Sequence, residues 1–97
     1  MKSITIKEFK EDYQNTEAIL LDVRTKEEFD EGHIEGAVNL PTHELQAKIE
    51  TLVPDKNTTI ISCCRSGGRS LVSCVALHQL GYTQAINLAG GYLAYCE

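Results

Sequence analysis

The stretch TTIISCCRSGGRS, Thr58 to Ser70, joins a short apolar run, two adjacent cysteines, two glycines and two arginines. Its first half, Thr58 to Ser62, is rich in β-branched residues and predicts a buried strand. Apolar residues then recur at helical spacing from Arg69 to Leu80, and Gly81 predicts the end of that helix. A strand, a glycine turn and a helix in this order are typical of one unit of a parallel α/β sheet.

Strands and helices alternate on both sides of this stretch. We expect further strands at 18–23, 37–40 and 85–88, and further helices beginning near Thr5, Thr25, Thr42 and Gly90. The helices near Thr5 and Thr25 are indicated by capping boxes, each with a glutamate three residues after the threonine. The sequence therefore predicts one domain over residues 1–97, an α/β fold with an open, mostly parallel sheet of about five strands and helices on both faces.

Composition narrows the possible partners and the cellular setting. The net charge of −5 over 97 residues argues against nucleic acid, which needs an excess of Lys and Arg. No apolar run approaches the roughly 20 residues of a membrane span, and no signal-peptide core follows Met1, so we expect a cytoplasmic protein without a membrane partner. The four cysteines form neither a CxxC nor a zinc-like pattern, which predicts free thiols and no metal.

The loop after Cys64 is a candidate anion site, and its residues are Arg65, Ser66, Gly67, Gly68 and Arg69. Glycine tolerates a positive φ, so the loop can curl and aim several backbone N–H groups inward. The following helix adds the positive end of its dipole, and the arginines add two permanent charges. A cysteine in this setting should have a lowered pKa and react as a thiolate nucleophile.

Counting to Arg69 from each cysteine gives two hypotheses. From Cys63 the spacing is Cys-x5-Arg, which resembles protein tyrosine phosphatases and predicts a phosphatase or an arsenate reductase. From Cys64 the ring is one residue shorter and suits a cysteine that carries one extra sulfur better than it suits phosphate. Ser62 stands where such phosphatases commonly have His. We expect Cys63 to end the strand with its thiol in the sheet packing, which favours Cys64.

Three segments, taken in order, resemble the rhodanese-type sulfurtransferases. CRSGGRS, Cys64 to Ser70, resembles their active-site loop, and LLDVRTKEEFDEGHIEGAVNLP, Leu20 to Pro41, resembles their N-terminal signature. NLAGGYLAY, Asn87 to Tyr95, resembles their C-terminal element, although Tyr95 stands near where a Trp is common. The resemblance covers nearly the whole chain and implies one rhodanese domain.

The resemblance implies a reaction as well as a fold. Cys64 would take a sulfane sulfur from a small anionic donor such as thiosulfate and pass the persulfide sulfur to cyanide or a thiol, possibly a protein thiol. The N–H groups from Arg65 to Arg69 would hold the persulfide charge, Arg65 would steer the donor, and Arg69 would brace the loop. No metal or organic cofactor is implied. A non-enzymatic persulfide carrier for a protein partner is a further alternative.

Other polar residues are interpreted as structural. We expect His33 in a structural turn, and a salt bridge or cap at Asp22 and Arg24. Cys74 should be a small core residue. The acidic cluster Glu27, Glu28, Asp30 and Glu31 is expected to be a solvated helix face, with a basic partner as the alternative.

Overall fold

The computed structural model describes residues 1–97. Its elements, in chain order, are β1 Ser3–Ile4, α1 Ile6–Asp12, β2 Ile19–Asp22, α2 Lys26–Glu31, β3 Val38–Asn39, the 3-10 helix η1 Thr42–Glu44, α3 Leu45–Leu52, β4 Ile60–Cys63, α4 Gly68–Gln79, β5 Ala85–Leu88 and α5 Gly91–Tyr95. No helix has both the length and the apolar character needed to cross a membrane.

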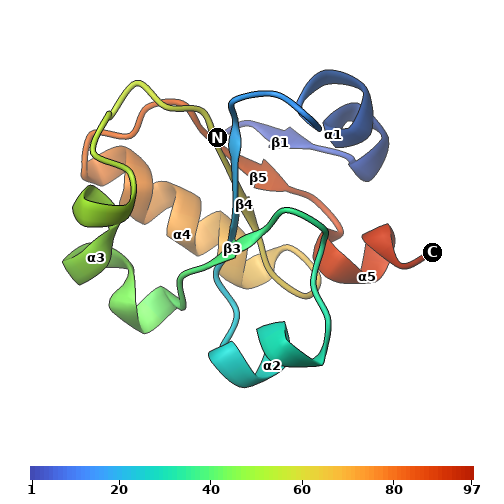
Figure 1. The fold of residues 1–97 in the computed structure, drawn as a ribbon. Coiled ribbons are helices and arrows are strands. Elements are labelled where there is room, and N and C mark those ends of the chain that lie inside the picture. Colours follow the sequence, from blue (N-terminus) through green and yellow to red (C-terminus); the bar gives the residue numbers. More distant parts are fainter.

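The five strands form one parallel sheet, as predicted, and the structure places them in the order β1-β5-β4-β2-β3 (Figure 1). The two-residue strand β1, at the edge beside β5, is too short to show a periodic pattern and was not among the strands expected individually. The central strands β2, β4 and β5 contain nearly only buried residues, which explains why they read as continuous apolar runs.

Helices cover both faces of the sheet, with α3 and α4 on one side and α1 and α5 on the other (Figure 1). One core cluster joins Leu21 and Ile60 to Leu45, Ile49 and Leu77. A second cluster lies on the opposite face, with Phe9 and Ile34 packed against the sheet. Cys63 belongs to this second cluster and Cys64 to the first, because successive side chains point to opposite faces of the sheet.

Both predicted capping boxes are present, and they fix where α1 and α2 begin. The Thr5 hydroxyl accepts from the Glu8 N–H, and the Thr25 hydroxyl accepts from the Glu28 N–H. A helix does begin at Thr42, as expected, but the Thr42 side chain does not cap it. Thr42 instead lies inside η1, which precedes α3 and has no side-chain cap, because the chain leaving Pro41 first makes a tighter turn.

The apolar side chains of α4 do not all face the core. Leu71, Val72 and Val75 are 41%, 70% and 43% exposed, whereas Ser70, Ser73, Cys74 and Leu77 are buried. The helix rotation is set at its first turn, where Ser62 Oγ donates to the Ser70 carbonyl at 3.3 Å. The side of α4 that packs on the sheet therefore contains two serines besides Cys74 and Leu77, and the prediction that Cys74 is a core residue is confirmed.

Candidate active site

The cysteine loop lies at the carboxyl ends of the strands, where parallel α/β sheets bind ligands. Strand β4 ends at Cys63, α4 begins at Gly68, and Gly67 precedes α4 as its N-cap with φ of 114°. A positive φ of this size is available to glycine and strained for other residues. Gly67 therefore makes the sharp turn that the sequence predicted between strand and helix.

The Cys64 thiol is buried beneath this loop and is surrounded by hydrogen-bond donors. Cys64 is 1% exposed, and the Gly67 N–H donates to its Sγ at 3.1 Å. Burial by itself raises the pKa of Cys64, but hydrogen bonds from Ser70, Gly67 and Ser66 outweigh burial and lower this pKa below its ordinary value. The loop thus stabilises a thiolate at Cys64.

The neighbouring Cys63 has the opposite environment. Its side chain is fully buried in the core cluster of the α1 face. Burial and the charge of Asp22 raise the pKa of the Cys63 thiol. Cys63 is therefore held as a neutral thiol, and Cys64 is the one whose surroundings favour the anion.

Helix α5 binds the outer side of the loop. The Tyr92 N–H donates to the Cys64 carbonyl at 2.9 Å, and the Leu93 N–H donates to the Arg65 carbonyl at 3.0 Å. The C=O and N–H of one planar trans peptide point in opposite directions. Binding the Arg65 carbonyl to α5 therefore turns the Ser66 N–H away from α5, in keeping with its contribution to the lowered pKa of Cys64.

Gly91 makes this close approach possible, and its role was not identified from the sequence. A Cβ at this position would lie 2.3 Å from the Cys64 carbonyl oxygen and 2.9 Å from the Arg65 carbonyl oxygen. Its φ of +53° is also in the left-handed region. The signal was the pair Gly90-Gly91, which the sequence places at a helix start and in the NLAGGYLAY segment without indicating a contact with the cysteine loop.

Ser70 is a second site residue that sequence reasoning missed. Its buried hydroxyl lies 3.1 Å from the Gly67 carbonyl and 2.5 Å from Asn87 Oδ1. It thereby ties the first turn of α4 to strand β5 and contributes to the lowered pKa of Cys64. Ser70 is the last residue of the CRSGGRS segment, but no role was predicted for it from the sequence.

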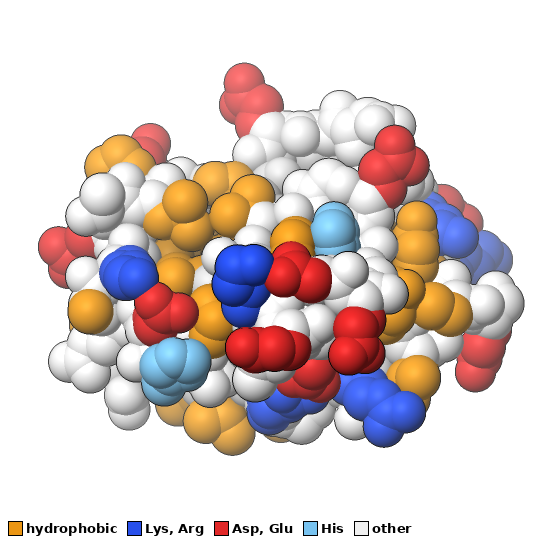
Figure 2. All heavy atoms as spheres, turned by 60° about the horizontal axis from the view of Figure 1, so that its bottom comes forward, with side chains coloured by type: hydrophobic (Ala, Val, Ile, Leu, Met, Phe, Trp, Pro, Cys, Tyr) orange, Lys and Arg blue, Asp and Glu red, His pale blue; other side chains and the backbone are white.

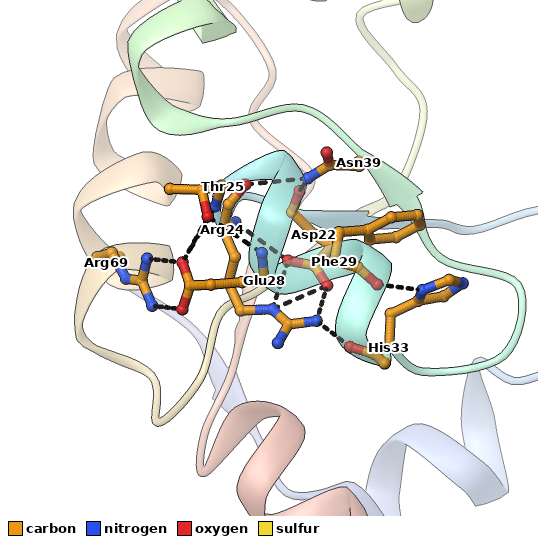
Figure 3. Close-up of polar contacts among 9 residues, drawn as sticks. Asp22, Arg24, Thr25, Glu28, Phe29, His33, Asn39 and Arg69 are labelled. Atoms are coloured by element: carbon orange, nitrogen blue, oxygen red, sulfur yellow. Dashed lines mark hydrogen bonds and ion pairs between the residues drawn. The ribbon is translucent and has the colours of Figure 1, made fainter.

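A buried ion pair joins Asp22 and Arg24 at the end of β2, where the sequence predicted a salt bridge or cap. Arg24 Nη2 lies 2.8 Å from Asp22 Oδ2, and Arg24 Nε lies 3.0 Å from Asp22 Oδ1 (Figure 3). The guanidinium also donates to the Gly32 carbonyl at 2.7 Å and lies over the Tyr92 ring. Asp22 pairs in register with Cys63, so this ion pair stands beside the cysteine strand end.

Arg69 pairs with Glu28 of α2 in two parallel hydrogen bonds. Nη1 lies 2.7 Å from Oε1 and Nη2 lies 2.9 Å from Oε2, and Figure 3 shows the two side chains facing each other. The Arg69 hydrogen bonds lower the pKa of Glu28 to about 2. Glu28 is therefore not only a solvated face residue, because the loop arginine reaches it, whereas Glu27, Asp30 and Glu31 are exposed as expected. Arg65 is exposed and takes part in no ion pair.

The remaining features near α2 are structural or lie apart from the cysteine. His33 Nδ1 lies 2.8 Å from the Phe29 carbonyl, and its ring stacks on Phe29 at 3.6 Å (Figure 3). Two surface hollows, of about 820 and 490 Å³, contain no residue of the cysteine loop. No three His, Cys, Asp or Glu side chains are grouped to hold a metal ion.

A parallel α/β sheet with a hydrogen-bonded cysteine thiol in a loop at its carboxyl edge defines a class of cysteine-loop proteins. Residues 5–97 match the family model of the rhodanese-like domain. The chain is 39% identical over 70 residues to thiosulfate sulfurtransferase PspE of Escherichia coli (strain K12), covering 72% of this chain and 67% of that protein. The chain therefore belongs to the rhodanese-like domain family, and the resemblance seen in the sequence is confirmed.

Solved structures agree with this assignment. The human single-domain sulfurtransferase TSTD1 superposes with a TM-score of 0.86 at 30% identity, covering 99% of this chain and 96% of that one. A rhodanese with anions from E. coli gives a TM-score of 0.72 at 36% identity, and the match covers 79% of this chain and 89% of that one. The predicted fold class, an open parallel sheet with helices on both faces, is confirmed.

Proposed function

We propose that residues 1–97 act as one rhodanese domain, a sulfurtransferase that carries sulfur as a persulfide on Cys64. The observation that carries the proposal is the thiol environment: Cys64 receives a hydrogen bond from the Gly67 N–H, and its pKa is lowered despite burial. The names of the relatives, a thiosulfate sulfurtransferase and a single-domain sulfurtransferase, support the same reaction class.

The reaction divides into two displacements at sulfur. The Cys64 thiolate attacks the sulfane sulfur of the donor, and the bond between the two donor sulfurs breaks. With thiosulfate, sulfite leaves with the electron pair and Cys64 holds a persulfide anion. An acceptor thiolate or cyanide then attacks the outer sulfur, forming a persulfide or thiocyanate and returning the Cys64 thiolate. No oxidant or reductant is consumed.

The loop supplies stabilisation for the persulfide anion and attraction for the donor. The N–H groups within 65–69 are the donors available to the outer sulfur, which lies beyond the Cys64 thiol that they already stabilise. Arg65, exposed and unpaired, is the better candidate to attract an anionic donor. Because Cys64 is buried, the donor must be small or present a slender end.

We further propose thiosulfate or another small sulfane donor, a thiol acceptor that includes protein thiols, and a cytoplasmic location where thiols stay reduced. All four cysteines are unpaired, in keeping with such a compartment. Neither nucleic acid nor a membrane belongs to this proposal, because the chain is acidic.

Intact-mass measurement after incubation with thiosulfate tests the proposal. We expect wild type and Cys63→Ser to gain one sulfur atom and Cys64→Ser to gain none. Addition of cyanide should remove the sulfur and release thiocyanate. If wild type gains no sulfur from thiosulfate or from any other sulfane donor, the proposed function is wrong.

The same variants separate the alternatives. A Cys63 phosphatase or arsenate reductase would lose aryl phosphate hydrolysis or arsenate reduction in Cys63→Ser. The buried, neutral Cys63 argues against that outcome. A non-enzymatic carrier would load sulfur on Cys64 yet turn over thiosulfate and cyanide very slowly.

A further inference from the structure

The two arginines of the cysteine loop differ in their charge environment. Arg69 donates two hydrogen bonds to Glu28, so its charge is matched by a carboxylate at 2.7 and 2.9 Å. Arg65 has no such partner. The mouth of the loop therefore presents one unmatched positive charge, although the sequence places two arginines there.

Glu28 is fixed in place from its own helix as well as by Arg69. Its Oε1 accepts the Thr25 N–H at 3.1 Å, and its own N–H donates to the Thr25 hydroxyl at 3.2 Å. This capping box holds the carboxylate at the start of α2, from where it faces Arg69 across the gap between the two helices (Figure 3). A carboxylate held from two sides does not swing away to leave Arg69 free for a ligand.

The neighbouring cation on α2 is itself paired with a carboxylate. Figure 2 looks toward the end of the molecule where α2 lies, and acidic side chains are interspersed there with Lys and Arg. Lys26 on the same helix pairs with Asp30 at 2.7 Å, so its charge is matched too. Glu27, next to Glu28, is exposed and has no ion-pair partner.

We propose that Glu28 is a specificity-determining residue, which limits the preference of the loop for dianionic sulfur donors by neutralising Arg69. The inference rests on the proposed sulfurtransferase function and concerns which donors that same loop accepts. A dianion such as thiosulfate responds twice as strongly to a change of local charge as a monoanion such as methanethiosulfonate. Both donors deliver a sulfane sulfur to Cys64, and their leaving groups are sulfite and methanesulfinate.

The charge of Glu28 lies close enough to the loop to act on a bound donor. Its partner Arg69 is the last residue of that loop, and the Cys64 thiolate contributes to the raised pKa of Arg69. Charges within a Debye length of roughly 10 Å interact with little screening. Removing one negative charge at this range should favour a dianion over a monoanion by about threefold.

The test compares sulfur loading of Cys64 by the two donors, at low ionic strength, in wild type, Glu28→Gln and Glu27→Gln. Glutamine keeps an oxygen that can accept the Thr25 N–H, so the start of α2 is preserved. We expect the ratio of rate constants, thiosulfate over methanethiosulfonate, to rise about threefold in Glu28→Gln. Glu27→Gln makes the same change of net charge at an exposed residue that does not contact the loop arginine, and it should raise the ratio by less than Glu28→Gln does.

A reciprocal variant protects the test against misfolding of Glu28→Gln. Arg69→Gln leaves the Glu28 charge unmatched and should lower the same ratio about threefold. Equal ratios in wild type and all three variants would overturn the inference, as would an equal rise in Glu28→Gln and Glu27→Gln. Those outcomes leave the proposed function standing, provided that methanethiosulfonate still loads Cys64. Failure of both donors to load wild type would instead refute the proposed function.

Discussion

Replacing Gly91 by alanine should destabilise the protein through one identifiable collision. The new Cβ would lie 2.3 Å from the Cys64 carbonyl oxygen, and real Cβ contacts are essentially never shorter than 3.0 Å. The left-handed φ of +53° adds about 1 kcal/mol for a residue with a side chain. Relieving the collision separates α5 from the loop, and the loss of the hydrogen bonds to the Cys64 and Arg65 carbonyls costs about 1 kcal/mol each. The expected total is about 3 kcal/mol.

Gly36→Ala provides a matched control. Gly36 has a positive φ of +87°, but a Cβ there would meet nothing within 4 Å. The free energy of unfolding of Gly36→Ala should therefore fall only by the cost of the left-handed backbone conformation, about 1 kcal/mol. The difference between the two variants, about 2 kcal/mol, measures the collision and the two hydrogen bonds.

Urea unfolding followed by circular dichroism measures both free energies of unfolding. Alkylation of Cys64 by iodoacetamide as a function of pH provides a second readout. Displacing the loop moves the Ser66 N–H away from the thiolate, so Gly91→Ala should raise the pH at which Cys64 reaches half of its maximal reactivity. If Gly91→Ala is no less stable than Gly36→Ala and its pH midpoint is unchanged, α5 does not hold the loop.

Three further changes test the other contacts of the site and core. Ser70→Ala removes a hydroxyl that contributes to the lowered pKa of the Cys64 thiol, so the pH midpoint of Cys64 alkylation should rise. An unchanged midpoint would assign the lowered pKa to the backbone N–H groups alone. Arg24→Leu leaves the Asp22 carboxylate buried without its partner, so the free energy of unfolding in urea should fall by about 3–5 kcal/mol. A fall of less than about 1 kcal/mol would contradict the buried ion pair. Tyr82→Phe removes the buried hydroxyl that donates to the Val53 carbonyl, so the free energy of unfolding should fall by about 1–3 kcal/mol. A variant more stable than wild type would contradict a stabilising role for this hydrogen bond.

The order of strands and helices could be predicted because the local signals agree with the final fold. The runs that became β2, β4 and β5 are buried on both faces, so they appear in the sequence as short apolar segments. The glutamates at Glu8 and Glu28 marked two helix starts correctly, because a capping box depends only on residues within one turn. The turn at Gly67 was also predictable, since glycine is the residue for a positive φ.

Contacts between distant segments could not be predicted in this way. The Arg69–Glu28 pair joins residues 41 positions apart, and no local pattern in α2 shows which glutamate meets the loop. The burial of Ser70 in place of Val72 depends on how α4 is rotated by its anchoring to β4. The requirement for Gly91 follows from how closely α5 approaches the cysteine loop. Each of these needs the tertiary arrangement, which spacing along the chain does not contain.

The hydrogen bonds from Tyr92 and Leu93 to the loop have a consequence for biosynthesis. A ribosome produces Cys64 well before it produces the residues that bind the Cys64 and Arg65 carbonyls. During that interval the nascent chain has the cysteine but lacks the helix that fixes the orientation of the surrounding peptide groups. The thiol therefore acquires its full hydrogen-bonded environment only after α5 has been synthesised and has docked on the loop.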